Sequence, residues 1–576
     1  MSKGRIDYIL RGEDFYERRF NIMAEKGSNG ILKQAGILAA AGIIVRIIGL
    51  LYKSPLTSII GDEGNGYYNA AYNWYITALM IASYSIPSAI SKVMSQKYAL
   101  GQYKSAQKLF RCALVFVGIS GTICGILLMA LSRFLVGEGG AYVLRVFGPT
   151  VLLYGPLGVL RGYFQANRTM VPTSISQIAE QIINAVVSIL AAFLLTNYAV
   201  SKLAANPDSG VNPAIYGAAG SALGTGAGVL TALLFMMFVY YLNRNRVKKQ
   251  MDSDHGAVDD TATILFQIIA VVVPFLFSTL LYNITPNINQ KIFYAFMMNV
   301  RGLGESETAS LYGVYAGKAL TITTIPIAMA SAMASAMIPS ISAKFIKGQR
   351  DEANAIATKV IRVSMLVAIP SAIGLIALAR PVTMILFPQR GSLDQAAMLL
   401  AVLSLTVIFY SQSTITNSVL QGTGKLIIPV INALIALIVQ TVILVLILYL
   451  TPLNNMSLVI TRVIYAFILF VLNDHACRKR LRLNLNTKTI YIMPLIASVI
   501  MGVCAFVIYY MVTIPFGGMK DVGYFVNLVA TGISICAGAL VYAAVLVKSG
   551  TITEQILKTL PKGNKVIRLL KKVRLL

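Results

Sequence analysis

The sequence has few charged residues and almost no histidine. Charged residues make up 12% of the 576 positions, about half the share of an ordinary soluble domain, which is about 25%. The two histidines, His255 and His475, lie between apolar runs, and no metal-ligand spacing, Walker loop or nucleophile elbow occurs. These absences argue against a metal centre, an ATPase and a hydrolase. We therefore expect no enzymatic activity and no cofactor.

Cysteine is scarce as well. The five cysteines form no CxxC pair, so we expect them to be reduced packing residues.

Long apolar runs are what the chain has in abundance. It is 57% hydrophobic with a mean hydropathy of +0.72, and about 20 apolar residues suffice to cross a bilayer as a helix. We predict an all-α polytopic membrane protein with 14 transmembrane helices, at about 31–51, 67–90, 110–135, 141–163, 172–196, 214–242, 262–284, 309–338, 360–386, 395–420, 426–450, 456–473, 489–513 and 523–547.

The net charge of +27 follows the membrane topology. Of the 49 Lys and Arg residues, 36 fall in the terminal segments and in every second connection, which the positive-inside rule assigns to the cytoplasm. We therefore expect a multi-pass membrane protein with both termini in the cytoplasm. Because topology explains the basic charge, a nucleic-acid partner is not expected.

One short sequence occurs twice, about 250 residues apart. Ile86-Pro87-Ser88 leads to Lys92 and Gly101-Gln102, and Ile338-Pro339-Ser340 leads to Lys344 and Gly348-Gln349. Leu160-Arg161-Gly162 is echoed in the same order by Leu420-Gln421-Gly422. Two related halves with six helices each would be parallel repeats, as in many transporters.

This repeat divides the chain into six predicted segments. They are a cytoplasmic N-terminal extension (1–30), a first lobe (31–242), a solvated cytoplasmic linker (243–261), a second lobe (262–473), two additional helices (489–547) and a basic tail (548–576). Within the tail, residues 564–576 have an amphipathic pattern, which favours contact with anionic lipids of the inner leaflet.

Five charged residues within the predicted helices stand out. They are Arg46, Arg145, Glu180, Lys318 and Arg462. A charge in the membrane is costly, and such residues usually face a cavity or a partner. We predict that Arg46 and Lys318, one from each lobe, line a cationic cavity for a phosphate or diphosphate, with Lys53, Arg145 and Arg462 as further candidates. Internal pairing and snorkelling are the alternatives. Glu180 is predicted to be a charge partner or a proton or sodium site.

Two further features bear on mechanism. Pro274 and Pro326 lie inside predicted helices and are candidate kinks for gating. An aromatic cluster occupies the outer end of the second helix, where an interfacial belt is the simpler interpretation and stacking on a sugar ring is the alternative; its members are Tyr67, Tyr68, Tyr72, Trp74 and Tyr75.

Several ordered motifs resemble one family. They are Gly49-Leu50-Leu51-Tyr52-Lys53-Ser54-Pro55-Leu56, Gly61-Asp62-Glu63-Gly64-Asn65-Gly66, Ile86-Pro87-Ser88, Arg161-Gly162-Tyr163-Phe164-Gln165 with Glu180, and Gly317-Lys318-Ala319-Leu320. The set is similar to the multidrug/oligosaccharidyl-lipid/polysaccharide (MOP) exporter superfamily, in the stage V sporulation protein B and polysaccharide biosynthesis branch related to the lipid II flippase.

The resemblance implies a V-shaped MATE/MOP-like fold with two six-helix lobes and two C-terminal helices. It also implies alternating access and an undecaprenyl-diphosphate-linked sugar as cargo. In the lipid II flippase branch, arginines of helices 1, 2 and 8 serve the diphosphate, and a groove beside helices 13 and 14 takes the lipid tail. Arg46 and Lys318 match the helix 1 and helix 8 positions, whereas helix 2 has only Lys92, at its inner end.

We therefore expect a monomeric flippase for a lipid-linked precursor of peptidoglycan or another envelope polysaccharide. Coupling to membrane potential, H⁺ or Na⁺ is possible in such a protein. A cation-coupled multidrug exporter of the same fold, an integral-membrane polymerase or ligase, and a non-transporting scaffold of wall or spore assembly are the alternatives.

Overall fold

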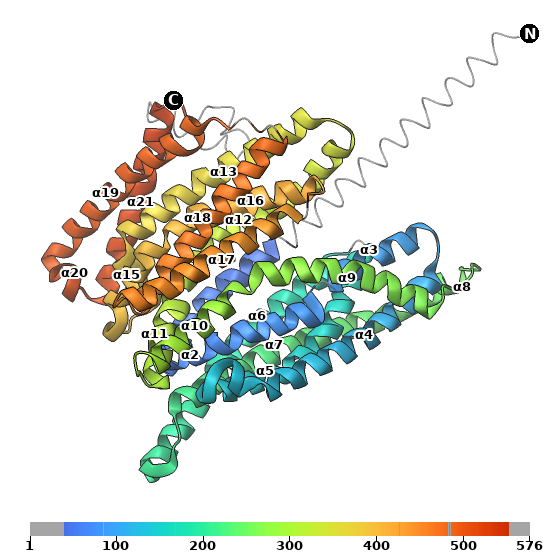
Figure 1. Ribbon diagram of the computed structural model, residues 1–576, viewed down its shortest axis with the longest axis horizontal. Helices are drawn as coiled ribbons and strands as arrows, with labels where there is room; N and C mark the ends of the chain where they lie inside the picture. The colour runs from blue at the N-terminus through green and yellow to red at the C-terminus, as the bar shows by residue number, and fades with distance from the viewer. Residues whose placement is uncertain are drawn as a thin grey trace, which may run out of the picture.

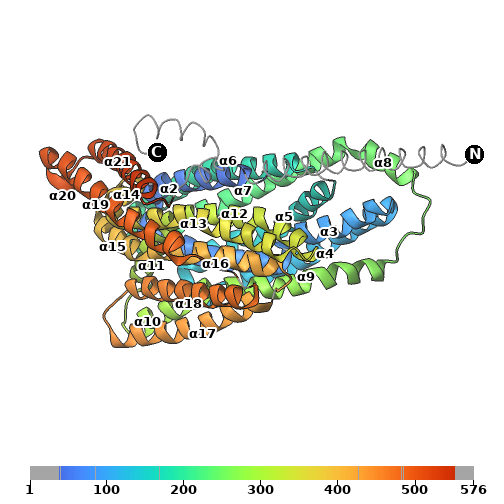
Figure 2. The same ribbon diagram turned by 90° about the horizontal axis from the view of Figure 1, so that it is seen from above.

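The computed structural model describes residue 38 and residues 40–551, apart from the single positions 85, 168, 426, 482 and 484. Within this part of the chain the secondary structure is helical, without strands, and the helices run along an elongated bundle (Figures 1 and 2). Twelve helices are long and apolar enough to cross a membrane, and Ala40–Leu51 and Thr261–Ala270 are shorter apolar helices. The predicted all-α multi-pass fold is confirmed, while the count of 14 stays a prediction.

The first part of the chain contains five of the twelve membrane-length helices and the shorter helix Ala40–Leu51. After Ala40–Leu51 come α2 (Lys53–Leu79), η1 (Met80–Tyr84), α3 (Ile86–Ala99), α4 (Tyr103–Ala130), α5 (Ser132–Ala166), α6 (Val171–Ala205), η2 (Pro207–Ser209), α7 (Pro213–Leu242) and α8 (Arg244–Asp252). The second predicted helix thus begins earlier than residue 67, with a break at Gly61, where φ is 68°.

The second part begins at α9 and continues to α21. Its elements are α9 (Thr261–Asn283), α10 (Thr285–Asn299), α11 (Glu305–Gly313), η3 (Val314–Ala319), α12 (Leu320–Ile346), α13 (Arg350–Ala377), α14 (Ala379–Leu386), η4 (Arg390–Ser392), α15 (Leu393–Leu403), α16 (Leu405–Gly422), α17 (Ile427–Leu450), α18 (Met456–Leu481), η5 (Lys488–Ile492), α19 (Met493–Thr513), η6 (Ile514–Phe516), α20 (Gly518–Asp521) and α21 (Tyr524–Lys548).

The helices form two groups whose axes diverge toward the end of the bundle that holds α8 (Figure 1). One group contains α2 to α7 and the other contains α12 to α21, with α9 packed against both α3 and α17. We call the two ends of the bundle the α8 end and the α11 end. The domain boundaries given above stay a prediction.

The repeated motif forms the same turn in both parts of the chain. Gly101 and Gly348 have φ values of 73° and 75°, and the following glutamines have φ/ψ of −84°/64° and −79°/62°. Both glutamine N–H groups donate to the carbonyl five residues earlier, at 2.9 and 3.0 Å. Only a residue that tolerates positive φ fits the glycine position. The sequence echo therefore records a real structural repeat.

In both parts of the chain the Leu-x-Gly motif packs against the Ile-Pro-Ser motif. A Cβ on Gly162 would lie 2.8 Å from the carbonyl oxygen of Pro87, and one on Gly422 would lie 3.3 Å from that of Ile338. In each part of the chain, the helix that ends in the Leu-x-Gly motif thus crosses closely over the Ile-Pro-Ser motif.

Two acidic residues of the predicted solvated linker attach it to the helices. Asp254 is only 6% exposed, and its carboxylate accepts hydrogen bonds from the backbone N–H of Lys104 (2.8 Å) and of Gly256 (2.9 Å). Asp259 pairs with Lys97, and its carbonyl accepts from Lys108 at 2.8 Å. Most of the linker is exposed, as predicted for a solvated connector, but these two acids find donors at the start of α4 and the end of α3.

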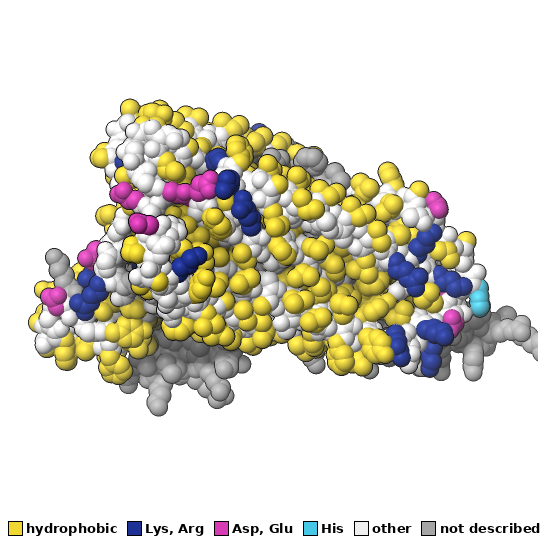
Figure 3. All heavy atoms as spheres, turned by 90° about the horizontal axis from the view of Figure 1, so that it is seen from below, with side chains coloured by type: hydrophobic (Ala, Val, Ile, Leu, Met, Phe, Trp, Pro, Cys, Tyr) yellow, Lys and Arg dark blue, Asp and Glu magenta, His cyan; other side chains and the backbone are white. Residues whose placement is uncertain are grey.

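Charge is unevenly distributed over the surface. Figure 3 shows basic side chains crowding the α8 end, whereas acidic side chains gather mainly toward the opposite end on that face. Apolar side chains cover the surface between them, as expected for a membrane-embedded bundle.

Candidate functional site

A cavity of about 550 Å³ lies between the two groups of helices. One side is formed by Ala40–Leu51, α2, α5, α6 and α7, and the other by η3 and α12. Its charged lining residues, among those that the structure describes, are Arg46, Lys53 and Glu180. The remaining polar lining consists of hydroxyl and amide groups: Tyr52, Tyr68, Asn69, Tyr72, Asn73, Tyr75, Tyr154, Gln181, Asn184, Thr225, Thr321 and Thr324.

The two basic side chains that line the cavity, Arg46 and Lys53, come from neighbouring positions in the sequence. Arg46 lies on Ala40–Leu51 and is exposed. Lys53, half-buried in the first turn of α2, donates to Thr321 Oγ1 of α12 at 3.1 Å and so bridges the two groups. Lys53 therefore lies on a helix that faces the cavity and not in an outer loop, because α2 begins at Lys53.

Glu180 faces the same cavity but is already paired. Its Oε2 lies 2.7 Å from Arg161 Nη2, and Arg161 is 5% exposed. Arg161 Nε also donates to Ser176 Oγ at 3.0 Å. Of the two predicted roles, the geometry matches the charge partner. The helix predicted at 141–163 continues to Ala166 as α5, so Arg161 is inside the bundle.

The aromatic cluster on α2 is buried. Tyr67, Tyr68 and Tyr75 are 3%, 4% and 2% exposed, so the interpretation as an interfacial belt was wrong. A belt requires rings at the lipid headgroups, whereas the α2 rings turn inward, and three of them line the cavity: Tyr68, Tyr72 and Tyr75.

Lys318 lies outside the lining of this cavity. It is 1% exposed, and its Nζ lies 2.6 Å from both Asp62 Oδ1 and Ser392 Oγ. Ser392 Oγ in turn donates to Asp62 Oδ2. Lys318 sits in the π-helical turn η3, a feature that often marks functional positions. The sequence analysis missed Asp62 as a partner, although it stands in one of the family-like motifs.

Around this ion pair α2 touches α11, which leads through η3 into α12, by backbone atoms. A Cβ on Gly66 would lie 1.9 Å from the carbonyl oxygen of Ala309, and a Cβ on Gly313 would lie 1.8 Å from that of Asp62. Asn73 Nδ2 donates across the same contact to the Tyr312 hydroxyl at 2.8 Å. The structure is thus tightly closed at the α11 end.

The other predicted site residues lie elsewhere. Arg145 Nε donates to Ser132 Oγ at 3.1 Å, and the guanidinium of Arg462 lies 5.3 Å from the centre of the Tyr410 ring. Neither lines the cavity. The helix α9 continues through Pro274 and α12 continues through Pro326, and the irregular turns fall at Ile284 and in η3.

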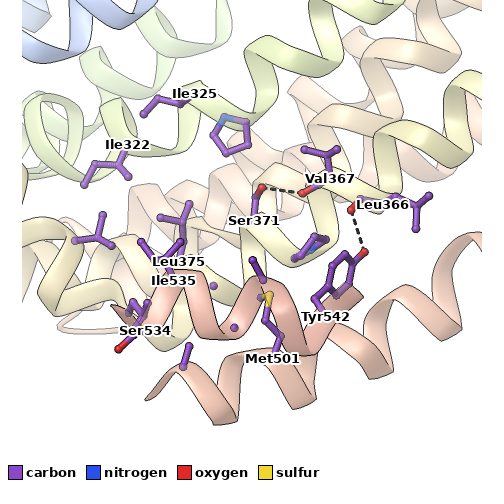
Figure 4. A pocket seen from close by; sticks show the side chains of 18 of the residues that line it. Ile322, Ile325, Leu366, Val367, Ser371, Leu375, Met501, Ser534, Ile535 and Tyr542 are labelled. Atoms are coloured by element: carbon purple, nitrogen blue, oxygen red, sulfur yellow. Dashed lines mark hydrogen bonds between the residues drawn. The ribbon is translucent and has the colours of Figure 1, made fainter. Parts of the chain in front are cut away.

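A second, apolar groove of about 560 Å³ opens between α12, α13, α14, α19 and α21 (Figure 4). Its few polar groups are satisfied within the protein: the Tyr542 hydroxyl donates to the Leu366 carbonyl at 2.9 Å, and Ser371 Oγ donates to the Val367 carbonyl at 2.7 Å. Ile325 of α12 lines both this groove and the cavity. The cationic cavity and the apolar groove therefore meet along one helix.

Comparisons with known proteins give a consistent assignment. A family model described as polysaccharide biosynthesis protein matches residues 31–345, and one described as MatE matches residues 287–447. The lipid II flippase MurJ of Bacillus subtilis (strain 168) is 24% identical over 434 residues, which cover 72% of this chain and 77% of that protein. Stage V sporulation protein B of the same strain is 25% identical over 316 residues, covering 54% and 58%.

Solved structures share the fold. A lipid II flippase MurJ in an inward closed conformation superposes with a TM-score of 0.62 and 13% identity, covering 88% of this chain and 97% of that one. An inward-facing multidrug resistance MATE family transporter of the MOP superfamily has a TM-score of 0.55 and 15% identity, covering 77% and 94%.

Proposed function

Because this chain belongs to the polysaccharide biosynthesis protein family, we propose that it carries a lipid-linked sugar across the bacterial cytoplasmic membrane. The cargo would be an undecaprenyl-diphosphate-linked precursor of peptidoglycan or of another envelope polysaccharide, moved by alternating access. Lys and Arg gather at the α8 end, which would face the cytoplasm by the positive-inside rule.

The observation that supports this most is the junction at Ile325. A polyprenyl lipid has a charged head and a long apolar tail, and the two sites offer matching environments side by side. Arg46 and Lys53 would hold the diphosphate, since guanidinium and ammonium groups are the common protein ligands of phosphate. The apolar groove between α12 and α21 would hold part of the tail.

Lys318 would bind the cargo in a different conformational state of the transporter from Arg46 and Lys53. It is paired with Asp62 while the α11 end is closed, and opening of that end would release it. We propose that Lys318 then becomes available to the diphosphate, which is consistent with the ligand role predicted from the sequence. Energy would come from membrane potential, H⁺ or Na⁺. The monomeric state stays a prediction, as does lipid contact of residues 564–576, which lie outside the described part of the chain.

The match to MatE makes a cation-coupled multidrug exporter the second candidate. A cationic drug would need an available carboxylate, yet Glu180, the acidic lining residue among the described positions, is bound to Arg161. The flippase is therefore the better fit to the cavity.

Native mass spectrometry of the purified protein with undecaprenyl diphosphate tests the proposal. We expect binding that weakens about tenfold in Arg46→Ala and in Lys53→Ala, since hydrogen bonds to charged groups contribute about 1.5–3 kcal/mol. Arg133→Ala is the matched control, because the Arg133 side chain is 62% exposed and lies outside the cavity. Binding of cationic drugs without binding of the diphosphate lipid would favour the exporter, and binding of neither would favour a scaffold.

A further inference from the structure

The tyrosines on the cavity side of α2 form a continuous aromatic ladder. Tyr68, Tyr72 and Tyr75 follow at steps of four and three residues, which return to one helix face. The Tyr68 and Tyr72 rings are stacked at 5.7 Å with 15° between their planes, and Tyr72 and Tyr75 are 5.8 Å apart. All three line the cavity that holds Arg46 and Lys53.

The ladder is held rigidly from behind. Phe147 of α5 is fully buried and stacks on Tyr75 at 4.5 Å with 18° between the planes. The Tyr68 hydroxyl lies 3.4 Å from Thr225 Oγ1 of α7. Tyr72 is the partly exposed member, so its ring is the one most accessible from the cavity. Fixed aromatic faces of this kind offer contact area at little cost in conformational entropy.

Amide groups surround the ladder. Asn69 Nδ2 donates to the Asn65 carbonyl at 2.7 Å, and Asn184 Oδ1 accepts from Ser188 Oγ at 2.9 Å. A side-chain amide has two N–H donors and an acceptor oxygen with two lone pairs. These protein bonds thus orient the two amides and leave them further hydrogen-bonding capacity. Gln181 adds a third amide to the same wall.

The charges of the cavity are matched to one diphosphate. Glu180 is neutralised by Arg161, so Arg46 and Lys53 supply two positive charges, and a diphosphate that links a lipid to a sugar carries about two negative ones. The tyrosine and amide wall carries no charged side chain among its described members. A further anionic group on the cargo would be desolvated there without a partner, which is costly.

We propose that this wall is the subsite for the sugar, and that it selects an uncharged sugar that carries hydroxyl and amide groups. The inference rests on the proposed function, because it assigns the part of the cavity beyond the diphosphate. The aromatic faces would contact the C–H face of the sugar ring, since the face of a π-system is electron-rich. The amides would exchange hydrogen bonds with the substituents of the ring.

Three lipids with the same polyprenyl chain test the subsite in a native mass spectrometry titration. They are undecaprenyl diphosphate, the same lipid with N-acetylglucosamine, and the same lipid with glucuronic acid. We expect the N-acetylglucosamine lipid to bind roughly 2- to 12-fold more tightly than the bare diphosphate, the range that about 0.5–1.5 kcal/mol of aromatic contact produces. The glucuronic acid lipid should bind more weakly than the N-acetylglucosamine lipid.

Tyr72→Leu should abolish the advantage of the sugar and leave binding of bare undecaprenyl diphosphate unchanged, whereas Tyr72→Phe should keep most of it. Tyr198→Leu, at a residue of α6 that is 57% exposed and outside the cavity, is the control. Equal loss for both lipids in Tyr72→Leu, or equal binding of the charged and uncharged sugars, would overturn the subsite while the diphosphate site stands. A wild-type protein that binds none of the three lipids would overturn the proposed function itself.

Discussion

The ion pair between Asp62 and Lys318 should hold the α11 end closed. Lys318 is 1% exposed, and its ammonium has the Asp62 carboxylate and the Ser392 hydroxyl as its partners, each at 2.6 Å. Asp62→Asn would leave the ammonium buried beside neutral groups. Removing one partner of a buried pair costs about 3–5 kcal/mol, and the lower value applies because the Asp62 side chain is 22% exposed.

This penalty falls on the closed state, where Lys318 cannot reach water. A change of about 3 kcal/mol shifts an equilibrium roughly 100-fold, so Asp62→Asn should populate states that are open at the α11 end. Spin labels at Asp208 and Gly391, which are exposed on the two groups, would report the opening as a longer distance in pulsed electron paramagnetic resonance.

Two companion variants make this measurement decisive. Asp394→Asn makes the same chemical change in the Arg380–Asp394 pair, where Asp394 is 76% exposed, and should leave the distances unchanged because exposed pairs contribute about 0–1 kcal/mol. Adding Lys318→Met to Asp62→Asn removes the stranded charge and should restore closure. Unchanged distances in Asp62→Asn, or an equal shift in Asp394→Asn, would refute the role of the pair as a latch.

Three further predictions concern other parts of the chain. Gly66→Val should open the α11 end in the same distance measurement, because even a Cβ would lie 1.9 Å from the Ala309 carbonyl oxygen; an unchanged distance would contradict this. Ser371→Phe should fill the apolar groove and weaken binding of undecaprenyl diphosphate several-fold while leaving a short-chain analogue unaffected. Backbone N–H groups of Lys104 and Gly256 hold the pKa of Asp254 below its usual 3.8. Attachment of the linker to α4 should therefore persist from pH 7 to about 4 and be lost as the pH falls through the lowered pKa. Hydrogen exchange at the Lys104 amide would report the release, and Asp254→Asn should weaken the attachment at neutral pH.

Much of the architecture could be predicted from local signals. Apolar runs mark the spans, and the echo at Gly101 and Gly348 predicted an internal repeat, at which both parts of the chain form the same turn. The hydrogen bonds that attach the linker to the helices could not be predicted from local signals. The acids Asp254 and Asp259 resemble a solvated segment in sequence, and their donors lie about 150 residues earlier.

The same distinction applies to the site. Because a charge inside the membrane is costly, the sequence identified Arg46, Glu180 and Lys318 as residues that need a cavity or a partner. It could not identify the partners, which come from other helices. Lys318 meets Asp62 across 256 positions, and the pairing of Glu180 with Arg161 depends on how α5 packs beside α6. The α2 tyrosines were assigned to a belt because the direction of a ring depends on neighbouring helices that composition does not reveal.

The closure at Gly66 and Gly313 is made by main-chain atoms, whereas the adjoining cavity is lined by side chains. Backbone packing, with the Asp62–Lys318 pair beside it, thus forms the closed end, whereas the proposed cargo site depends on side-chain chemistry. A transporter built in this way can acquire a different cargo through substitutions in its cavity without redesigning its seal, and one scaffold could in this way serve several envelope polymers.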